Sequence, residues 1–125
     1  MVAIDANVLV RRITNDHPIL SPKALKLITI AKPGSLLLDR LVIEEVAYVL
    51  SSNYDFSKDQ VSAVLRSLVS EEVFTIPDRD MVELTIRLFE TEKPLSFEDC
   101  WLLALKKSGK VTNVVTFDVN LLKRT

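Results

Sequence analysis

The chain has 125 residues, of which 48% are hydrophobic and 26% charged, and its formal net charge is −1. This composition excludes extensive disorder and predicts a single globular domain over residues 1–125 with one hydrophobic core. The nearly balanced charge excludes a generally basic protein that coats nucleic acids. One cysteine and one histidine exclude an intrachain disulfide and Cys- or His-rich metal sites, and they favour a reduced, cytoplasmic setting.

The sequence also lacks the signatures of several common functional classes. With only two glycines, it contains neither the GxGxxG pattern of dinucleotide-binding proteins nor the GxxxxGK[ST] pattern of P-loop proteins. No apolar run reaches the roughly 18 residues that a membrane-spanning helix needs. We therefore expect no membrane association.

Short β-branched or apolar runs alternate with segments of helical periodicity along the whole chain. In the first half we expect, in order, a strand at Val2–Ile4, a helix at Val8–Ile13 capped by Asn7, a turn at 15–18, a helix at Ile19–Ala31, a strand at Leu36–Leu38 and a helix at Leu41–Leu50. In the second half we expect a helix at Ser57–Val69, a strand at Val73–Ile76, a helix from Asp78 to about Thr91, a helix at Phe97–Lys107, a strand at Val111–Thr116 and a last short helix that Asp118 opens.

Several helix ends carry recognisable signals. Ser57 followed by Gln60 three residues later is a capping-box pattern, and Ser96 is the expected cap of the helix that Gly109 ends. In the helix at Leu41–Leu50, the expected apolar stripe passes through Leu41, Val42, Glu45, Val46, Val49 and Leu50. Glu45 is thus predicted to lie on an inward-facing stripe.

The alternation of apolar strands with helices predicts an α/β fold. Nearly uninterrupted apolar strands are typical of a parallel sheet that is covered on both faces, so we expect a single-domain three-layer α/β/α sandwich with a central, mainly parallel sheet of four or five strands. In such folds, ligands bind beyond the carboxyl ends of the strands. Asp5 and Asp118 each follow a predicted strand, which is the first indication of a shared site.

Four carboxylates stand out by position: Asp5, Glu45, Asp99 and Asp118. Clustered carboxylates repel one another, and a carboxylate on an apolar stripe is costly unless it is paired or bound to metal. A hard divalent cation such as Mg²⁺, or Mn²⁺, would resolve this conflict. The four acids together therefore favour a shared metal site.

Each acid also has a simpler interpretation when it is taken singly. Asp5 alone is better explained as a turn residue at a strand end, and Glu45 is equally compatible with the solvent edge of its helix. Asp99 lies three positions after its candidate cap, where it complements the helix dipole, and Asp118 is a typical N-cap. Only the combination in one α/β chain favours the metal site.

The order of four segments resembles the PIN domain, and within it the VapC-type toxins of toxin–antitoxin pairs. The segments are Val-Ala-Ile-Asp-Ala-Asn, Glu-Val-Ala-Tyr-Val-Leu, Phe-Glu-Asp-Cys-Trp-Leu-Leu-Ala-Leu and Val-Val-Thr-Phe-Asp, which together span nearly the whole chain. The resemblance implies a metal-dependent endoribonuclease whose acidic set corresponds to Asp5, Glu45, Asp99 and Asp118. It further implies Mg²⁺ as cofactor, with Mn²⁺ as an alternative, and small polar residues near the metal that match Asn7 and Thr116.

The resemblance also implies partners. These are an RNA substrate, a second copy of the chain in a homodimer, and a small antitoxin whose tail covers the acidic groove. Glu44 competes with Glu45 for the role of the helical acid, and Glu45 is preferred because it directly precedes Val46 in the family pattern. Asn120 stands where the family often has a further acid, and the chain ends before the family's usual last strand.

Other functional classes fit the sequence less well. Receiver domains place two adjacent acids before the phosphoacceptor Asp and a lysine late in the chain, and that arrangement is absent here. Haloacid-dehalogenase-type phosphatases usually show Asp-x-Asp, and Asn7 takes the second place in this chain. A catalytically inactive PIN-like module that binds RNA or protein is the main alternative. No basic stripe is present, so candidate RNA contacts are scattered: Arg11, Arg12, Lys106, Lys107, Lys110, Lys123 and Arg124.

Overall fold

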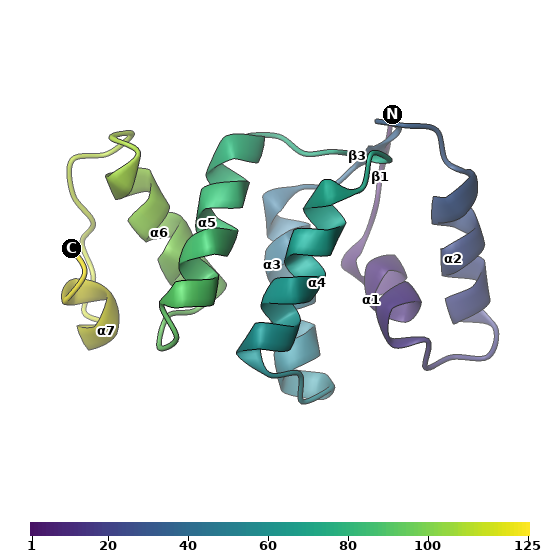
Figure 1. Ribbon diagram of the computed structural model, residues 1–125, viewed down its shortest axis with the longest axis horizontal. Helices are drawn as coiled ribbons and strands as arrows, with labels where there is room; N and C mark the ends of the chain where they lie inside the picture. The colour runs from purple at the N-terminus through teal and green to yellow at the C-terminus, as the bar shows by residue number, and fades with distance from the viewer. The chain divides into compact units, whose positions relative to one another are not determined.

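Helices and short strands alternate through the first two-thirds of the chain, as predicted. The computed structural model describes all 125 residues, Met1–Thr125, and divides them into two compact units, Met1–Pro77 and Asp78–Thr125. The elements of the first unit are β1 (Val2–Ala3), α1 (Ala6–Thr14), α2 (Leu20–Ile30), β2 (Leu36–Leu37), α3 (Arg40–Asn53), α4 (Lys58–Ser70) and β3 (Phe74–Thr75) (Figure 1). Those of the second are α5 (Arg79–Thr91), α6 (Phe97–Lys107) and α7 (Val119–Leu122).

The three strands form one parallel sheet in the order β1-β2-β3. Val2 pairs with Leu36, and Leu36 pairs in turn with Phe74, so that β2 is the central strand. Leu36 and Phe74 are buried, as expected of strands that carry apolar side chains on both faces. The predicted α/β class and the parallel sheet are therefore confirmed.

The predicted fourth strand at Val111–Thr116 is wrong, and the sheet has three strands instead of four or five. A strand exists only where its backbone pairs with a neighbour, and this segment belongs to the second unit, which contains no ladder. The N–H of Val111 donates instead to the carbonyl of Leu105. The side chain of Val115 is 95% exposed, so β-branched composition did not by itself produce a strand.

Four helices of the first unit form one continuous layer. Helix α1 packs against both α2 and α3, and α3 packs against α4 (Figure 1). The connections from β1 to β2 and from β2 to β3 run in the same direction across the sheet. Because crossovers between parallel strands are right-handed in nearly all proteins, both pairs of helices are expected on the same face of the sheet. The three-layer arrangement of the whole chain, with helices on both faces of the sheet, stays a prediction.

Helix α3 buries a different face from the one that the sequence predicted. Its buried residues are Ile43, Val46, Ala47 and Leu50. Leu41 is 60% exposed, and Glu45 is exposed as well. Because successive helical residues are rotated by about 100°, Glu45 lies on the side opposite to this buried face. The prediction that Glu45 lies on an inward-facing apolar stripe is therefore wrong.

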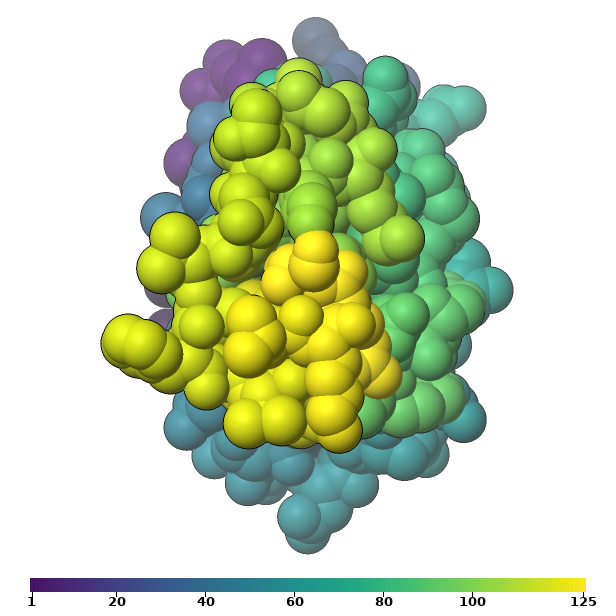
Figure 2. Space-filling view, turned by 90° about the vertical axis from the view of Figure 1, so that its left-hand side faces the viewer, coloured from purple at the N-terminus to yellow at the C-terminus, as the bar shows by residue number.

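The second unit is built on a helical hairpin. Helices α5 and α6 pack against each other, and the rings of Phe89 and Phe97 meet edge to face with centroids 6.1 Å apart. Leu121 of α7 is buried, and Arg124 forms an ion pair with Glu92. Figure 2 shows the C-terminal residues, in yellow, against the green helices of this unit.

No helix combines the length and the apolar character that crossing a lipid bilayer demands.

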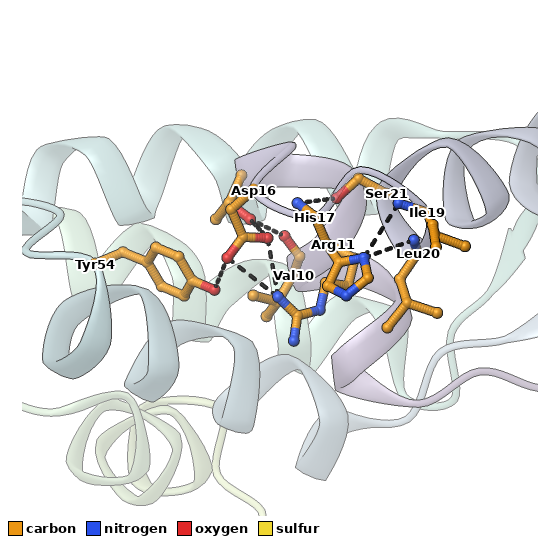
Figure 3. Close-up of polar contacts among 9 residues, drawn as sticks. Val10, Arg11, Asp16, His17, Ile19, Leu20, Ser21 and Tyr54 are labelled. Carbon is orange, nitrogen blue, oxygen red and sulfur yellow. Dashed lines mark hydrogen bonds and ion pairs between the residues drawn. The ribbon is translucent and has the colours of Figure 1, made fainter.

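Asp16 connects the loop between α1 and α2 to the end of α3. Its carboxylate accepts hydrogen bonds from Arg11 Nη1 at 3.0 and 3.1 Å, from Thr14 Oγ1 at 2.9 Å and from the hydroxyl of Tyr54 at 2.5 Å (Figure 3). Tyr54 is the C-cap residue of α3. The bond from Tyr54, with those from Thr14 and Arg11, lowers the pKa of Asp16 from 3.8 to about 2.

This lowered pKa predicts a loss of stability in acid. A carboxylate whose pKa is depressed by folding stabilises the protein above its ordinary pKa, and that contribution disappears as the pH falls from about 4 to about 2. We expect Asp16→Asn to be less stable than the natural protein at pH 7 and to show a flatter dependence of unfolding free energy on pH in this range. Urea titrations at several pH values measure both effects.

Asp55→Asn is the matched control, because Asp55 is an exposed neighbour of Tyr54 and adopts a left-handed backbone that Asn tolerates. If Asp55→Asn flattened the acid dependence as much as Asp16→Asn, the proposed role of the Asp16 cluster would be wrong.

Candidate functional site

Asp5 stands between β1 and α1 with its carboxylate nearly unused. It is the N-cap residue of α1, with φ −88° and ψ 152°, but its side chain makes no capping hydrogen bond. The only contact of its carboxylate is with Asn7, whose Nδ2 lies 3.5 Å from Asp5 Oδ2. Because the Asp5 carboxylate is exposed and does not cap the helix, it is available to bind a ligand.

Asn7 was predicted to cap this helix, and that prediction is wrong. Helix α1 begins at Ala6, so Asn7 lies inside the first turn. The helix starts earlier because the two-residue strand β1 ends at Ala3, which leaves Asp5 as the last residue with extended backbone. Asn7 is instead a neighbour of the Asp5 carboxylate, and its place near a metal stays a prediction.

The two adjacent glutamates of α3 differ in their surroundings. Glu45 is exposed, whereas Glu44 is half-buried and its Oε1 is fully enclosed. Exposure makes the Glu45 carboxylate accessible, whereas one carboxylate oxygen of Glu44 is shielded from solvent. The choice of Glu45 as the functional acid stays a prediction, and a helical wheel centred on Ile43 and Leu50 would have indicated its exposure.

Asp99 is held in place at the start of α6 by a reciprocal pair of hydrogen bonds. The N–H of Asp99 donates to Ser96 Oγ at 3.1 Å, and the N–H of Ser96 donates to Asp99 Oδ2 at 3.2 Å. This is a complete capping box, with Asp in the position usually taken by Glu or Gln. The predicted cap Ser96 is thus confirmed, and the box fixes the direction of the Asp99 carboxylate.

Asp118 is fixed in the same way at the start of α7. Its Oδ1 accepts from the N–H of Leu121 at 2.9 Å, which confirms the predicted N-cap. The N–H of Asp118 donates in turn to Thr116 Oγ1 at 3.0 Å. The Thr116 side chain therefore contacts the backbone of Asp118, and the N–H of Leu121 holds the Asp118 carboxylate.

The candidate acids are divided equally between the units, Asp5 and Glu45 in the first and Asp99 and Asp118 in the second. Within neither unit are three or more Asp, Glu, His or Cys side chains grouped so as to hold a metal ion. As a donor set the four acids fit Mg²⁺ or Mn²⁺, because they offer hard oxygens. Three of them lie at the starts of helices, and capping bonds hold two of these, Asp99 and Asp118. Their convergence in one site stays a prediction.

Several predicted RNA-contacting residues are already engaged. Arg11 pairs with Asp16, Arg12 forms two hydrogen bonds with Glu71 at 2.6 and 2.8 Å, and Arg124 pairs with Glu92. Lys106 donates to the carbonyl of Thr125. The exposed candidates that remain are three lysines of the second unit, namely Lys107, Lys110 and Lys123.

A groove of about 420 Å³ lies between α1 and α2, and the sequence did not indicate it. Asn7 is one of its lining residues, so the groove extends from the neighbourhood of Asp5. Apolar side chains form much of its wall, and Arg11 and Lys23 bring two cations to it. A second depression of about 460 Å³, in the other unit, is lined by Arg79, Arg87, Ser108 and Lys110 together with acidic residues.

The cap of α6 leads to a stability prediction. We expect Ser96→Ala to lower the free energy of unfolding by about 1 kcal/mol, because the N–H of Asp99 loses its acceptor. Ser57→Ala should cost a similar amount at α4, where Ser57 and Gln60 form the other capping box. Urea unfolding of both variants measures the losses, with Ser96→Thr as a control that keeps the hydroxyl. Equal losses for Ser96→Thr and Ser96→Ala would contradict the capping role.

A comparison with protein families gives one match. The family model described as PIN domain matches residues 2–125, which include both units and all six predicted site residues. No curated protein and no solved structure matches the chain.

Proposed function

We propose, because the chain belongs to the PIN domain family, that it is a metal-dependent endoribonuclease. PIN domains are commonly nucleases, so a hydrolase of phosphodiester bonds is the activity that the family supports in general. The finer assignment to RNA and to a divalent metal is our own. It is supported by the order of acids along the chain and by the chemistry of their oxygens.

The observation that carries the proposal is the state of Asp5. Its carboxylate follows a parallel strand, is exposed and makes no capping bond, although N-cap Asp residues usually do. A helix start that leaves its acid unused is explained if the acid serves a ligand. The expected ligand is a hard cation, because the set consists of carboxylate oxygens and offers neither the imidazole nitrogens nor the thiolates that softer metals prefer.

The residues that would hold the cation are Asp5, Glu45, Asp99 and Asp118. When bound, Mg²⁺ or Mn²⁺ lowers the pKa of a water molecule and offsets negative charge on the phosphate in the transition state. The capping bonds hold Asp99 and Asp118 in fixed directions before any substrate arrives. Asn7 lies beside the Asp5 carboxylate, and Thr116 accepts from the backbone N–H of Asp118. Glu45 or Asp99 is the candidate to orient or deprotonate the attacking water.

The biological setting is part of the proposal. We infer from the resemblance that the protein is the toxin of a type II toxin–antitoxin pair, acts in the cytoplasm and forms a homodimer. A small antitoxin would restrain it by covering the acidic site. The competing function is a PIN-like module without catalytic activity that binds RNA or protein.

Removal of the metal separates these two functions. We expect purified protein to cleave an RNA pool with Mg²⁺ or Mn²⁺, to lose all detectable cleavage in a chelator, and to recover it when excess Mg²⁺ is added back. Gel analysis of end-labelled RNA measures the cleavage. Expression alone should arrest growth, and co-expression of the neighbouring reading frame should relieve the arrest if it encodes the antitoxin.

The outcomes point in different directions. Cleavage that persists in chelator would indicate a contaminant or a metal-free mechanism. Metal-dependent heat in calorimetry without cleavage of any RNA would favour the inactive module.

A further inference from the structure

A helical turn that starts at His17 precedes the regular helix α2, Leu20–Ile30. The N–H of Ser21 donates to the carbonyl of His17 at 3.1 Å, which is the spacing of an α-helical bond. His17 is therefore the residue that caps this turn. Pro18 follows it at the first position of this turn, before α2 proper begins at Leu20, where the missing N–H of proline costs nothing.

The imidazole of His17 satisfies the free donors of this turn. Its Nδ1 accepts from the N–H of Leu20 at 2.9 Å and from the N–H of Ile19 at 3.2 Å (Figure 3). The N–H of His17 donates in return to the hydroxyl of Ser21, which is 2% exposed. The pattern is a reciprocal cap in which histidine takes the place of Ser, Thr, Asp or Asn.

This cap works in only one protonation state. A neutral imidazole can accept at Nδ1, but an imidazolium carries N–H on both nitrogens and accepts nothing. Its positive charge would also face the positive end of the helix dipole. Histidine side chains commonly change charge between pH 5 and 8, a range in which Ser, Thr and Asn caps do not change.

Several charged or titratable groups lie on the elements around His17. Figure 3 shows Arg11 of α1, Asp16 of the loop and Tyr54 at the end of α3, and α2 contributes Lys23, which lines the groove with Arg11. The pKa of Asp16 is about 2 and that of Tyr54 is raised above 10, each because of the hydrogen bond between them.

We infer that His17 is a pH-sensitive cap of α2, which holds the first turn of the helix when neutral and releases it when protonated. Leu20 and Lys23 line the groove between α1 and α2, so release of this turn loosens one wall of that groove. Mild acid should therefore change the shape of the groove while the rest of the fold stays intact. This inference is independent of nuclease activity and of the metal.

Amide hydrogen exchange tests the inference in the natural protein. Between pH 7.5 and 5.5 we expect the protection factor of the Leu20 amide, corrected for the intrinsic pH dependence of exchange, to fall roughly tenfold. The amide of Gln60 is the internal control, because the hydroxyl of Ser57 caps it at 3.1 Å and does not titrate. Its protection factor should change little.

The variant His17→Asn provides the second comparison. Asn is among the best N-cap residues and accepts at every pH, so the variant is expected to fold and to keep Leu20 protected at both pH values. An equal fall for Leu20 and Gln60 in the natural protein, or the same fall of Leu20 in His17→Asn, would overturn the inference. So would a Leu20 amide that is unprotected at pH 7.5.

Discussion

Replacement of Asp5 by Asn is expected to reduce RNA cleavage roughly 100- to 1,000-fold, while the protein keeps its fold. This range is the loss of rate that follows when one group that stabilises charge in a transition state is removed. Asn is nearly isosteric with Asp, and the side chain of Asp5 makes no capping bond that the change would break. The measurement is the rate of cleavage at saturating Mg²⁺, beside thermal unfolding of both proteins.

The acids of the second unit, Asp99 and Asp118, are tested in the same assay, and an acid adjacent to Asp99 provides the control. Asp99→Asn and Asp118→Asn should lose cleavage to a similar degree. Both variants should keep their helix caps, because an Asn oxygen still accepts the capping bonds. Glu98→Gln is the matched control, because Glu98 is exposed, precedes Asp99 in the first turn of α6 and is not among the predicted acids. Loss of activity in Glu98→Gln, or full activity in Asp5→Asn, would contradict the proposed site.

In the same assay, Glu45→Gln should reduce cleavage more than Glu44→Gln. The opposite order would assign the functional glutamate to the half-buried position.

Truncation of Leu50 in α3 is expected to produce the largest loss of stability. Leu50 is 0% exposed and belongs to the buried face of its helix. Leu50→Ala removes apolar surface from the core and leaves a cavity that its neighbours fill only in part, which costs about 2–5 kcal/mol. Urea unfolding gives the difference, which is a large part of the total stability of a domain of this size.

The matched variant is Leu41→Ala in the same helix. Leu41 is 60% exposed, so its truncation should change the free energy of unfolding by less than about 0.5 kcal/mol. The sequence pattern had placed both leucines on one buried stripe. Equal losses for the two variants would contradict the assignment of the buried face of α3 to the side of Ile43 and Leu50.

Local signals were readable from the sequence because they depend on residues close together in the chain. Ser57 with Gln60, Ser96 and Asp118 all cap the helices predicted for them. The parallel sheet was also predictable, because Leu36 and Phe74 lie in apolar runs between helices. The cap formed by His17 was missed, since histidine is not among the usual N-cap residues and its turn was read only as a loop.

Features that depend on residues far apart in the chain were harder to predict from the sequence. Val111–Thr116 has the composition of a strand, but a strand needs a neighbour, which no local pattern supplies. On α3, two stripes about half a turn apart both contain apolar residues, and only tertiary packing selects the one with Ile43. The four acids were found by their order along the chain, whereas their mutual distances depend on how the two units assemble.

Three non-glycine residues hold a left-handed backbone at helix boundaries. They are Asn15 after α1, Asp55 after α3 and Asp78 before α5, with φ between 50° and 56°. Asn and Asp tolerate this region far better than β-branched residues, for which it is a strained conformation. The left-handed backbone therefore restricts which amino acids these three positions can accept as the sequence evolves. Relatives that keep the path should carry Asn, Asp or Gly there, even where the surrounding loops differ in sequence.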